Sequence, residues 1–146
     1  MKTRLLLAVS VVVALAATAW AADPKLEGVK CIMNGKAPAK AEKSAEYKGG
    51  KVFFCCDNCP KGFAADPAKH ATKANLQLAL TGQTKQEKCP FSGQPVDASK
   101  STKVSGVDVA FCCDGCKGKV EKSKPEDAVE LVFADKAFDK GFKVTK

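Results

Sequence analysis

One cysteine pattern occurs twice in this chain, and it constrains the fold more than any other feature. Each copy places four cysteines in the order C…C-C-x-x-C, with a glycine soon after the first cysteine and a phenylalanine directly before the adjacent pair. The first copy contains Cys31, Cys55, Cys56 and Cys59, and the second contains Cys89, Cys112, Cys113 and Cys116. Agreement in order, spacing and flanking residues indicates a tandem duplication of one structural unit.

Metal binding is the use of these thiols that the pattern favours. A unit this small buries too little apolar area to be stable alone, and a bound metal ion can supply the missing free energy. Structural zinc sites place cysteines on a turn and at a helix start, where the helix dipole favours thiolates. We therefore expect all eight cysteines to be candidate ligands for about one Zn(II) or Cu(I) ion per copy. A site with fewer than four converging thiols would suit Cu(I).

Two other uses of the thiols remain open. An even number of cysteines in a short exported chain is typical of a disulfide framework, which would make the protein a disulfide-stapled interaction module without metal. The C-x-x-C pairs Cys56–Cys59 and Cys113–Cys116 would suit a thiol–disulfide oxidoreductase. The βαβ pattern of a thioredoxin-like domain is missing, however, and His70 is the only histidine. We therefore expect no enzymatic activity.

The N-terminal segment predicts export. Residues Met1–Ala22 read as a signal peptide: Lys2 and Arg4 precede an apolar stretch over Leu5–Thr18, and Ala19-Trp20-Ala21 forms a cleavage site. The apolar stretch is shorter than the about 20 residues that a membrane span needs. We expect a periplasmic or secreted protein with no membrane span once this segment is removed.

The charge of the chain argues against nucleic acid as a partner. The formal net charge is +8, but the only arginine is Arg4, in the predicted signal peptide. Arginine is the preferred side chain for bidentate recognition of phosphates and base edges. The lysines are spread along the sequence, which is typical of a hydrated surface. A metal ion is the expected partner, and another exported protein remains open.

Local signals predict a β-hairpin and a short helix in each copy. Strands are expected at Ser44–Tyr47 and Lys51–Phe54 around Lys48-Gly49-Gly50, and at Thr102–Val104 and Val107–Phe111 around Ser105-Gly106. A helix should begin at each C-C-D-x-x-C segment. Asp57 and Asp114 are expected to cap these helices, and Phe63 and Val120 to fill the core.

Further helices are expected after each copy. Asp66-Pro67 predicts a helix over 68–80 that ends at Thr81-Gly82, and Pro125 predicts another, although Val129–Phe133 also fits a strand. The polar stretch Gly82–Lys88 is the predicted linker. We therefore divide the chain into the signal peptide at 1–22, a first repeat at 23–82 and a second at 83–146.

Both copies resemble the YHS/TRASH superfamily of small metal-binding, treble-clef-like domains. The resemblance rests on the first cysteine, the hairpin with its central glycine, and the Phe-Cys-x-x-x-Cys segments Phe54–Cys59 and Phe111–Cys116. It implies an α+β fold of two tandem treble-clef-like units, each a hairpin plus a helix and each followed by an additional helix. It also implies binding of zinc, copper or another heavy metal, in metal storage, sensing, trafficking or resistance.

The chain departs from this family at the ligands. Many relatives carry a second cysteine three residues after the first, where this chain has Asn34 and Ser92. An additional cysteine stands instead at Cys56 and Cys113. It either supplies the fourth thiolate or leaves a three-coordinate site, and the resemblance does not decide between them.

Overall fold

Each copy of the cysteine pattern folds into a β-hairpin followed by a short helix. The computed structural model describes residues 24–145, so the predicted signal peptide lies outside the described residues. In the first copy, β1 (Lys40–Tyr47) and β2 (Gly50–Phe54) pair antiparallel and precede α1 (Asn58–Ala65). In the second, β4 (Asp97–Val104) and β5 (Val107–Phe111) precede α3 (Asp114–Glu121). The predicted hairpins and helices are therefore confirmed, within a mixed α+β architecture.

Both hairpins close through the same two-residue turn. Its central residues have positive φ in each copy, 50° and 85° at Lys48 and Gly49, and 47° and 93° at Ser105 and Gly106. Such a turn matches the right-handed twist of the flanking strands. Gly50, which the sequence placed in the turn, is instead the first residue of β2. It is buried there, and a Cβ atom at this position would lie 2.8 Å from Leu78 Cδ2.

The segments that follow the two hairpin–helix units differ. After the first, the chain forms a 3-10 turn (Ala68–His70) and then α2 (Ala71–Leu80), which ends at Thr81-Gly82 as predicted. After the second, it forms α4 (Pro125–Phe133) and α5 (Asp135–Gly141). Val129–Phe133 is therefore helical. The second copy is followed by two helices where one was expected.

The predicted linker contains a strand. Residues Thr84–Gln86 form β3, which pairs antiparallel with β6 (Phe142–Val144) near the C-terminus. This pairing holds the connection between the two copies against the end of the chain. The segment is therefore an ordered part of the fold, and its polar composition reflects its exposure.

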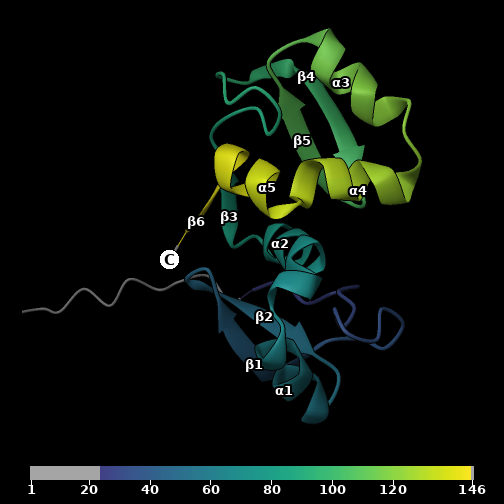
Figure 1. Cartoon of the computed structure of the whole chain (residues 1–146), viewed down its shortest axis with the longest axis vertical. Coiled ribbons are helices and arrows are strands. Elements are labelled where there is room, and N and C mark those ends of the chain that lie inside the picture. The colour runs from purple at the N-terminus through teal and green to yellow at the C-terminus, as the bar shows by residue number, and fades with distance from the viewer. Residues whose placement is uncertain (1–23, 146) are drawn as a thin grey trace, which may run out of the picture.

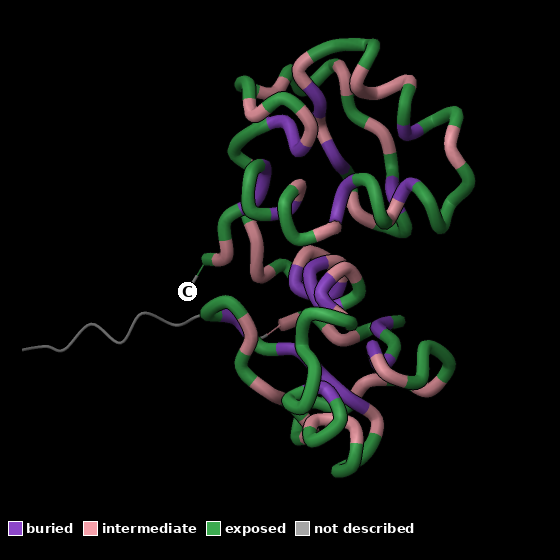
Figure 2. The backbone as a smooth tube through the Cα atoms, in the orientation of Figure 1, coloured by how far each residue is buried: buried purple, intermediate pink, exposed green. Residues whose placement is uncertain are grey.

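Helix α2 lies between the two hairpins and forms the centre of the molecule (Figure 1). It packs against β2 on one side and against α4 and α5 on the other. Half of its ten residues are buried, and they face its neighbours in the core (Figure 2). Ala74 and Leu78 are fully buried, and both belong to one apolar cluster that includes residues of both copies, such as Phe54 and Phe111. Among residues 24–145, the helices are too short and too polar to cross a membrane.

Glutamine side chains cover the edges of the two-stranded sheets. The Gln77 side chain accepts from the Phe53 N–H at 2.6 Å and donates to the Phe53 carbonyl at 3.0 Å. Gln86 makes the same pair of hydrogen bonds to Ala110, at 2.9 and 2.7 Å. Ala110 occupies in β5 the position that Phe53 occupies in β2. In both copies a glutamine therefore bonds to the backbone N–H and carbonyl of the same strand position, although Gln77 belongs to α2 and Gln86 to β3.

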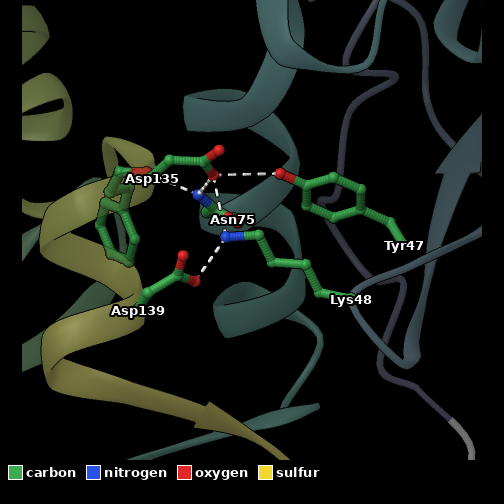
Figure 3. A network of polar contacts seen from close by, with 6 residues as sticks. Tyr47, Lys48, Asn75, Asp135 and Asp139 are labelled. Carbon is green, nitrogen blue, oxygen red and sulfur yellow. Dashed lines mark hydrogen bonds and ion pairs between the residues drawn. The ribbon is translucent and has the colours of Figure 1, made fainter.

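A polar network joins the first hairpin to α5 (Figure 3). Lys48, in the β1–β2 turn, forms ion pairs with Asp135 at 2.9 Å and Asp139 at 2.5 Å. The Tyr47 hydroxyl donates to Asp135 at 3.2 Å, and the Asn75 side chain donates to the same carboxylate at 3.0 Å. These contacts hold the two copies in one arrangement around α2.

Candidate metal centres

Three cysteines of each copy converge at one point. The sulfur atoms of Cys31, Cys55 and Cys59 all lie within 4.8 Å of one another. The second triad meets the same limit and consists of Cys89, Cys112 and Cys116. Each triad contains one buried and two half-buried cysteines. The helices that carry them, α1 and α3, lie towards opposite ends of the molecule, so the chain has two separate candidate centres (Figure 1).

The first cysteine of each triad lies in a tight turn closed by a glycine. The Gly35 N–H donates to the Cys31 carbonyl at 2.7 Å, and the Gly93 N–H donates to the Cys89 carbonyl at 2.8 Å. Gly35 and Gly93 have φ values of 70° and 73°, which a residue with a Cβ atom rarely adopts. The turn therefore depends on the glycine that the sequence repeats in both copies.

The hairpin and helix supply the other two cysteines. Phe54 and Phe111 end β2 and β5 and are fully buried, which fixes the end of each strand against the core. Cys55 follows Phe54 directly, and the turn into α1 then brings Cys59 within 3.7 Å of it. The equivalent sulfur–sulfur distance between Cys112 and Cys116 is 3.8 Å.

These sulfur separations fit thiolates around one metal ion. A zinc–sulfur bond of about 2.3 Å in tetrahedral geometry places two sulfurs roughly 3.8 Å apart. A disulfide would require about 2.05 Å. All eight cysteines lie in the described part of the chain and are free thiols. The shortest contact between their sulfurs is the 3.3 Å between Cys56 and Cys59. Each triad could therefore hold one thiophilic ion.

The turn stabilises the thiolate of the buried cysteine. Burial opposes ionisation of Cys89, but backbone N–H groups of Ser92, Cys112 and Phe91 donate to its sulfur, and the net effect lowers its pKa to about 6. Cys31 is arranged similarly: burial again opposes ionisation, backbone N–H groups outweigh it, and the pKa falls below its ordinary value. A negative charge at this position prepares each triad for a cation.

The pKa of the last cysteine of each triad is raised instead of lowered. Burial, followed by contact with the thiols of Cys113 and Cys112, raises the pKa of Cys116 to about 12. Contact with Cys56, followed by burial, raises the pKa of Cys59. The first and last cysteines of each triad are thus shifted in opposite directions, because neighbouring thiols oppose one another's ionisation. Metal binding would displace the remaining protons.

The additional cysteine of each copy lies at the edge of its triad. Cys56 and Cys113 are exposed, and neither belongs to the group whose sulfurs are mutually within 4.8 Å. The Cys56 sulfur lies 3.3 Å from that of Cys59, whereas the Cys113 sulfur lies 3.8 Å from that of Cys112. The structure thus brings together six of the eight predicted ligands and places the other two beside them.

A lysine–aspartate pair flanks each exposed cysteine. Lys43 bonds to Asp57, and Lys100 bonds to Asp114 at 2.7 Å. The lysines come from an irregular register in β1 and β4 that both copies share. As predicted, Asp57 is the N-cap residue of α1 and Asp114 lies in the first turn of α3, but neither makes a capping hydrogen bond through its side chain.

The residues that stand in place of the family's second cysteine, Asn34 and Ser92, have different surroundings in the two copies. The Ser92 hydroxyl lies 3.2 Å from the Cys112 sulfur, at the edge of the second triad. Asn34, its counterpart in the first copy, is exposed like Ser92, but among the described residues its side chain makes no such contact with a triad sulfur. The second centre therefore has a hydroxyl beside its thiols where the family that the sequence resembles has a thiol.

Sequence reasoning located the triads but missed their surroundings. The lysine–aspartate pairs could have been found by aligning the copies, because a lysine precedes each Cys-Asp step at equal spacing. Met33 packs partly buried against the core. His70 is half-buried, with its ring centroid 6.4 Å from that of Phe63.

Comparisons with known proteins found no match: no family model, curated protein or solved structure is similar to this chain. The candidate function therefore rests on the geometry of the two triads and on the chemistry of their sulfurs.

Proposed function

We propose that this protein is an exported metal-binding protein that holds one thiophilic ion in each cysteine triad. The observation that carries the proposal is the convergence of three sulfurs within 4.8 Å, repeated in two copies at opposite ends of the molecule. Two separate surface-near centres suit storage and trafficking of an ion as well as a structural role. The proposal includes no catalytic turnover.

The number of converging sulfurs favours Cu(I) over Zn(II). Structural zinc almost always has four protein ligands, whereas soft thiolate sites of lower coordination suit Cu(I). Zn(II) would need a fourth donor, which Cys56 or Cys113 could provide after a change of side-chain rotamer. We therefore assign Cu(I) as the preferred ion and Zn(II) as the weaker one.

The arrangement around each triad also supports a treble-clef-like unit of the YHS/TRASH type. A glycine-closed turn carries the first ligand, and a hairpin and the helix after it carry the other two. The predicted signal peptide supports a periplasmic or secreted location, where copper is handled outside the cytoplasm by thiolate and other soft ligands.

Anaerobic titration of the reduced protein with Cu(I) and, separately, with Zn(II) tests this function. We expect two equivalents of Cu(I) to bind, with ultraviolet thiolate-to-metal absorption that saturates at that ratio. Cys31→Ser and Cys89→Ser should each weaken Cu(I) binding at one centre, because each leaves only two converging sulfurs. Asn58→Ser, an exposed substitution that removes no sulfur, is the matched control and should bind both.

Two results would contradict the proposal. One is a reduced protein that binds neither ion with an affinity above that of free cysteine. The other is an unchanged affinity for two equivalents when both Cys31 and Cys89 are replaced, because the ions would then occupy another place.

A further inference from the structure

The sulfurs of each copy form a graded series from the core to the solvent. Cys31 is fully buried, Cys55 and Cys59 are half-buried, and Cys56 is exposed. The second copy repeats the series with Cys89, Cys112, Cys116 and Cys113. An ion that enters or leaves a triad therefore meets one solvent-facing thiol outside the three that converge.

The exposed thiol is close enough to reach an ion without belonging to its resting site. Cys56 lies 3.3 Å from Cys59, and Cys113 lies 3.8 Å from Cys112. In both copies it is exposed and stands outside the group of three converging sulfurs. This position fits a side chain that approaches the triad from outside.

The backbone beside this thiol is held in place while the thiol itself is free. The residue after each exposed cysteine is the aspartate that pairs with a lysine of the neighbouring strand, Asp57 with Lys43 and Asp114 with Lys100. The exposed sulfur is thereby kept beside its triad in both copies, at a high effective concentration.

From this arrangement we propose that Cys56 and Cys113 are exchange ligands, which take the ion from the triad and pass it to an acceptor thiol or chelator in solution. This rests on the proposed binding of Cu(I) by the triads. In the exchange, the exposed thiol loses its proton to solvent and forms a bond to Cu(I). One triad sulfur then gives up its bond and takes a proton. Donor atoms of the acceptor then displace the two remaining triad sulfurs and finally the exposed thiolate in the same way, each released thiolate takes a proton from solvent, and copper stays Cu(I) throughout.

The test is the rate at which Cu(I) moves from the fully loaded protein to bicinchoninate, followed by the colour of the chelate under anaerobic conditions. In Cys56→Ser, the fraction of copper held by the first copy should leave at least about tenfold more slowly, because a tethered ligand is replaced by one that must arrive from solution. The other copy serves as an internal control and should release at the wild-type rate. Cys113→Ser should show the reverse, and Asn58→Ser should behave as wild type.

Copper content before the transfer separates this proposal from the one on which it rests. Both serine variants should still bind two equivalents, as should Cys56→Ala and Cys113→Ala, which retain no oxygen donor. If a variant loses one equivalent, the exposed cysteine is a fixed ligand and the exchange proposal is overturned. It is also overturned if both variants bind two equivalents and release them at the wild-type rate. If the wild-type protein binds no Cu(I), the proposed function itself is wrong.

Discussion

At the scale of single residues, small differences between the two copies determine what each centre can bind. The sequence predicted the ligands because cysteines in a duplicated pattern are a local signal. It did not predict which three would converge, because that depends on how far the side chains after β2 and β5 extend from the strand end. Ser92 shows the same limit: only the fold places its hydroxyl 3.2 Å from Cys112.

Ser92→Cys should convert the second centre into a four-thiolate site. The new sulfur would stand where a hydroxyl already lies at the edge of the triad, and four thiolates match the coordination that zinc prefers. We expect Zn(II) to bind this copy at least about tenfold more tightly, roughly 1.4 kcal/mol. Competition with a chromophoric zinc chelator measures the affinity. Asn34→Cys is the control at the equivalent exposed position and should give a smaller gain. Equal gains at both positions would contradict this account.

The stability of the metal-free protein should depend on the ionisation of Cys89. Its pKa is lowered to about 6 in the folded protein, whereas an unfolded thiol titrates at about 8.5. Because the folded pKa is the lower one, the stabilisation is fully present above about pH 8.5 and disappears as the pH falls to about 6. The free energy of unfolding should therefore rise with pH across this window.

Denaturant unfolding of the reduced, metal-free protein at several pH values measures this dependence. Thiolate absorbance near 240 nm, recorded in the same samples, should begin to rise well below the ordinary pKa of a thiol. In Cys89→Ser the rise in stability should be smaller and this early absorbance should decrease. A wild-type protein whose first thiolate appears only near pH 8.5 would show that the turn does not stabilise the charge.

At the scale of elements, the sequence predicted what local signals determine. Turn glycines located both hairpins, and Pro125 located the start of α4. It did not predict the pairing of β3 with β6, because residues 84–86 and 142–144 are distant in sequence and segments of three residues are too short to show a periodic pattern. Only the packing of α5 brings them together.

Two glycine substitutions should have opposite effects on stability. A Cβ atom at Gly141, the last residue of α5, would lie 2.9 Å from the Lys88 carbonyl oxygen and 3.0 Å from Pro90 Cα, next to the turn that carries Cys89. Gly141→Ala should therefore cost about 1–3 kcal/mol. Gly118→Ala, inside α3, meets no atom within 4 Å and should stabilise by about 0.5–1 kcal/mol. Thermal or denaturant unfolding of both variants measures this, and a neutral Gly141→Ala would show that the turn and α5 can separate.

At the scale of the whole molecule, the two copies share one core. The apolar cluster contains residues from both hairpins, and α2 contacts β2, α4 and α5. Duplication alone suggested two repeats with a boundary near Gly82, because sequence patterns describe each copy by itself. The side chains that join the copies are polar ones such as Lys48 and Asp135, and their partners are far apart in sequence.

The shared helix predicts that residues 24–145 unfold as one cooperative unit. Leu78 is fully buried at the centre of α2, so Leu78→Ala should cost about 2–5 kcal/mol. Amide hydrogen exchange should show that β2 and β5 lose protection by the same amount in this variant. Leu76→Ala, at a half-buried position of the same helix, is the control and should cost less. Loss of protection confined to β2 would mean that the copies unfold separately.

The most direct test of the central claim is a joint count of metal ions and thiols in the protein isolated under anaerobic conditions from its native source. We predict two thiophilic ions per chain, and eight thiols that react after the metal is removed and the chain is unfolded without reductant. Protein that contains no metal, and whose cysteines react only after reduction, would contradict the account and show that the sulfurs are held as disulfides.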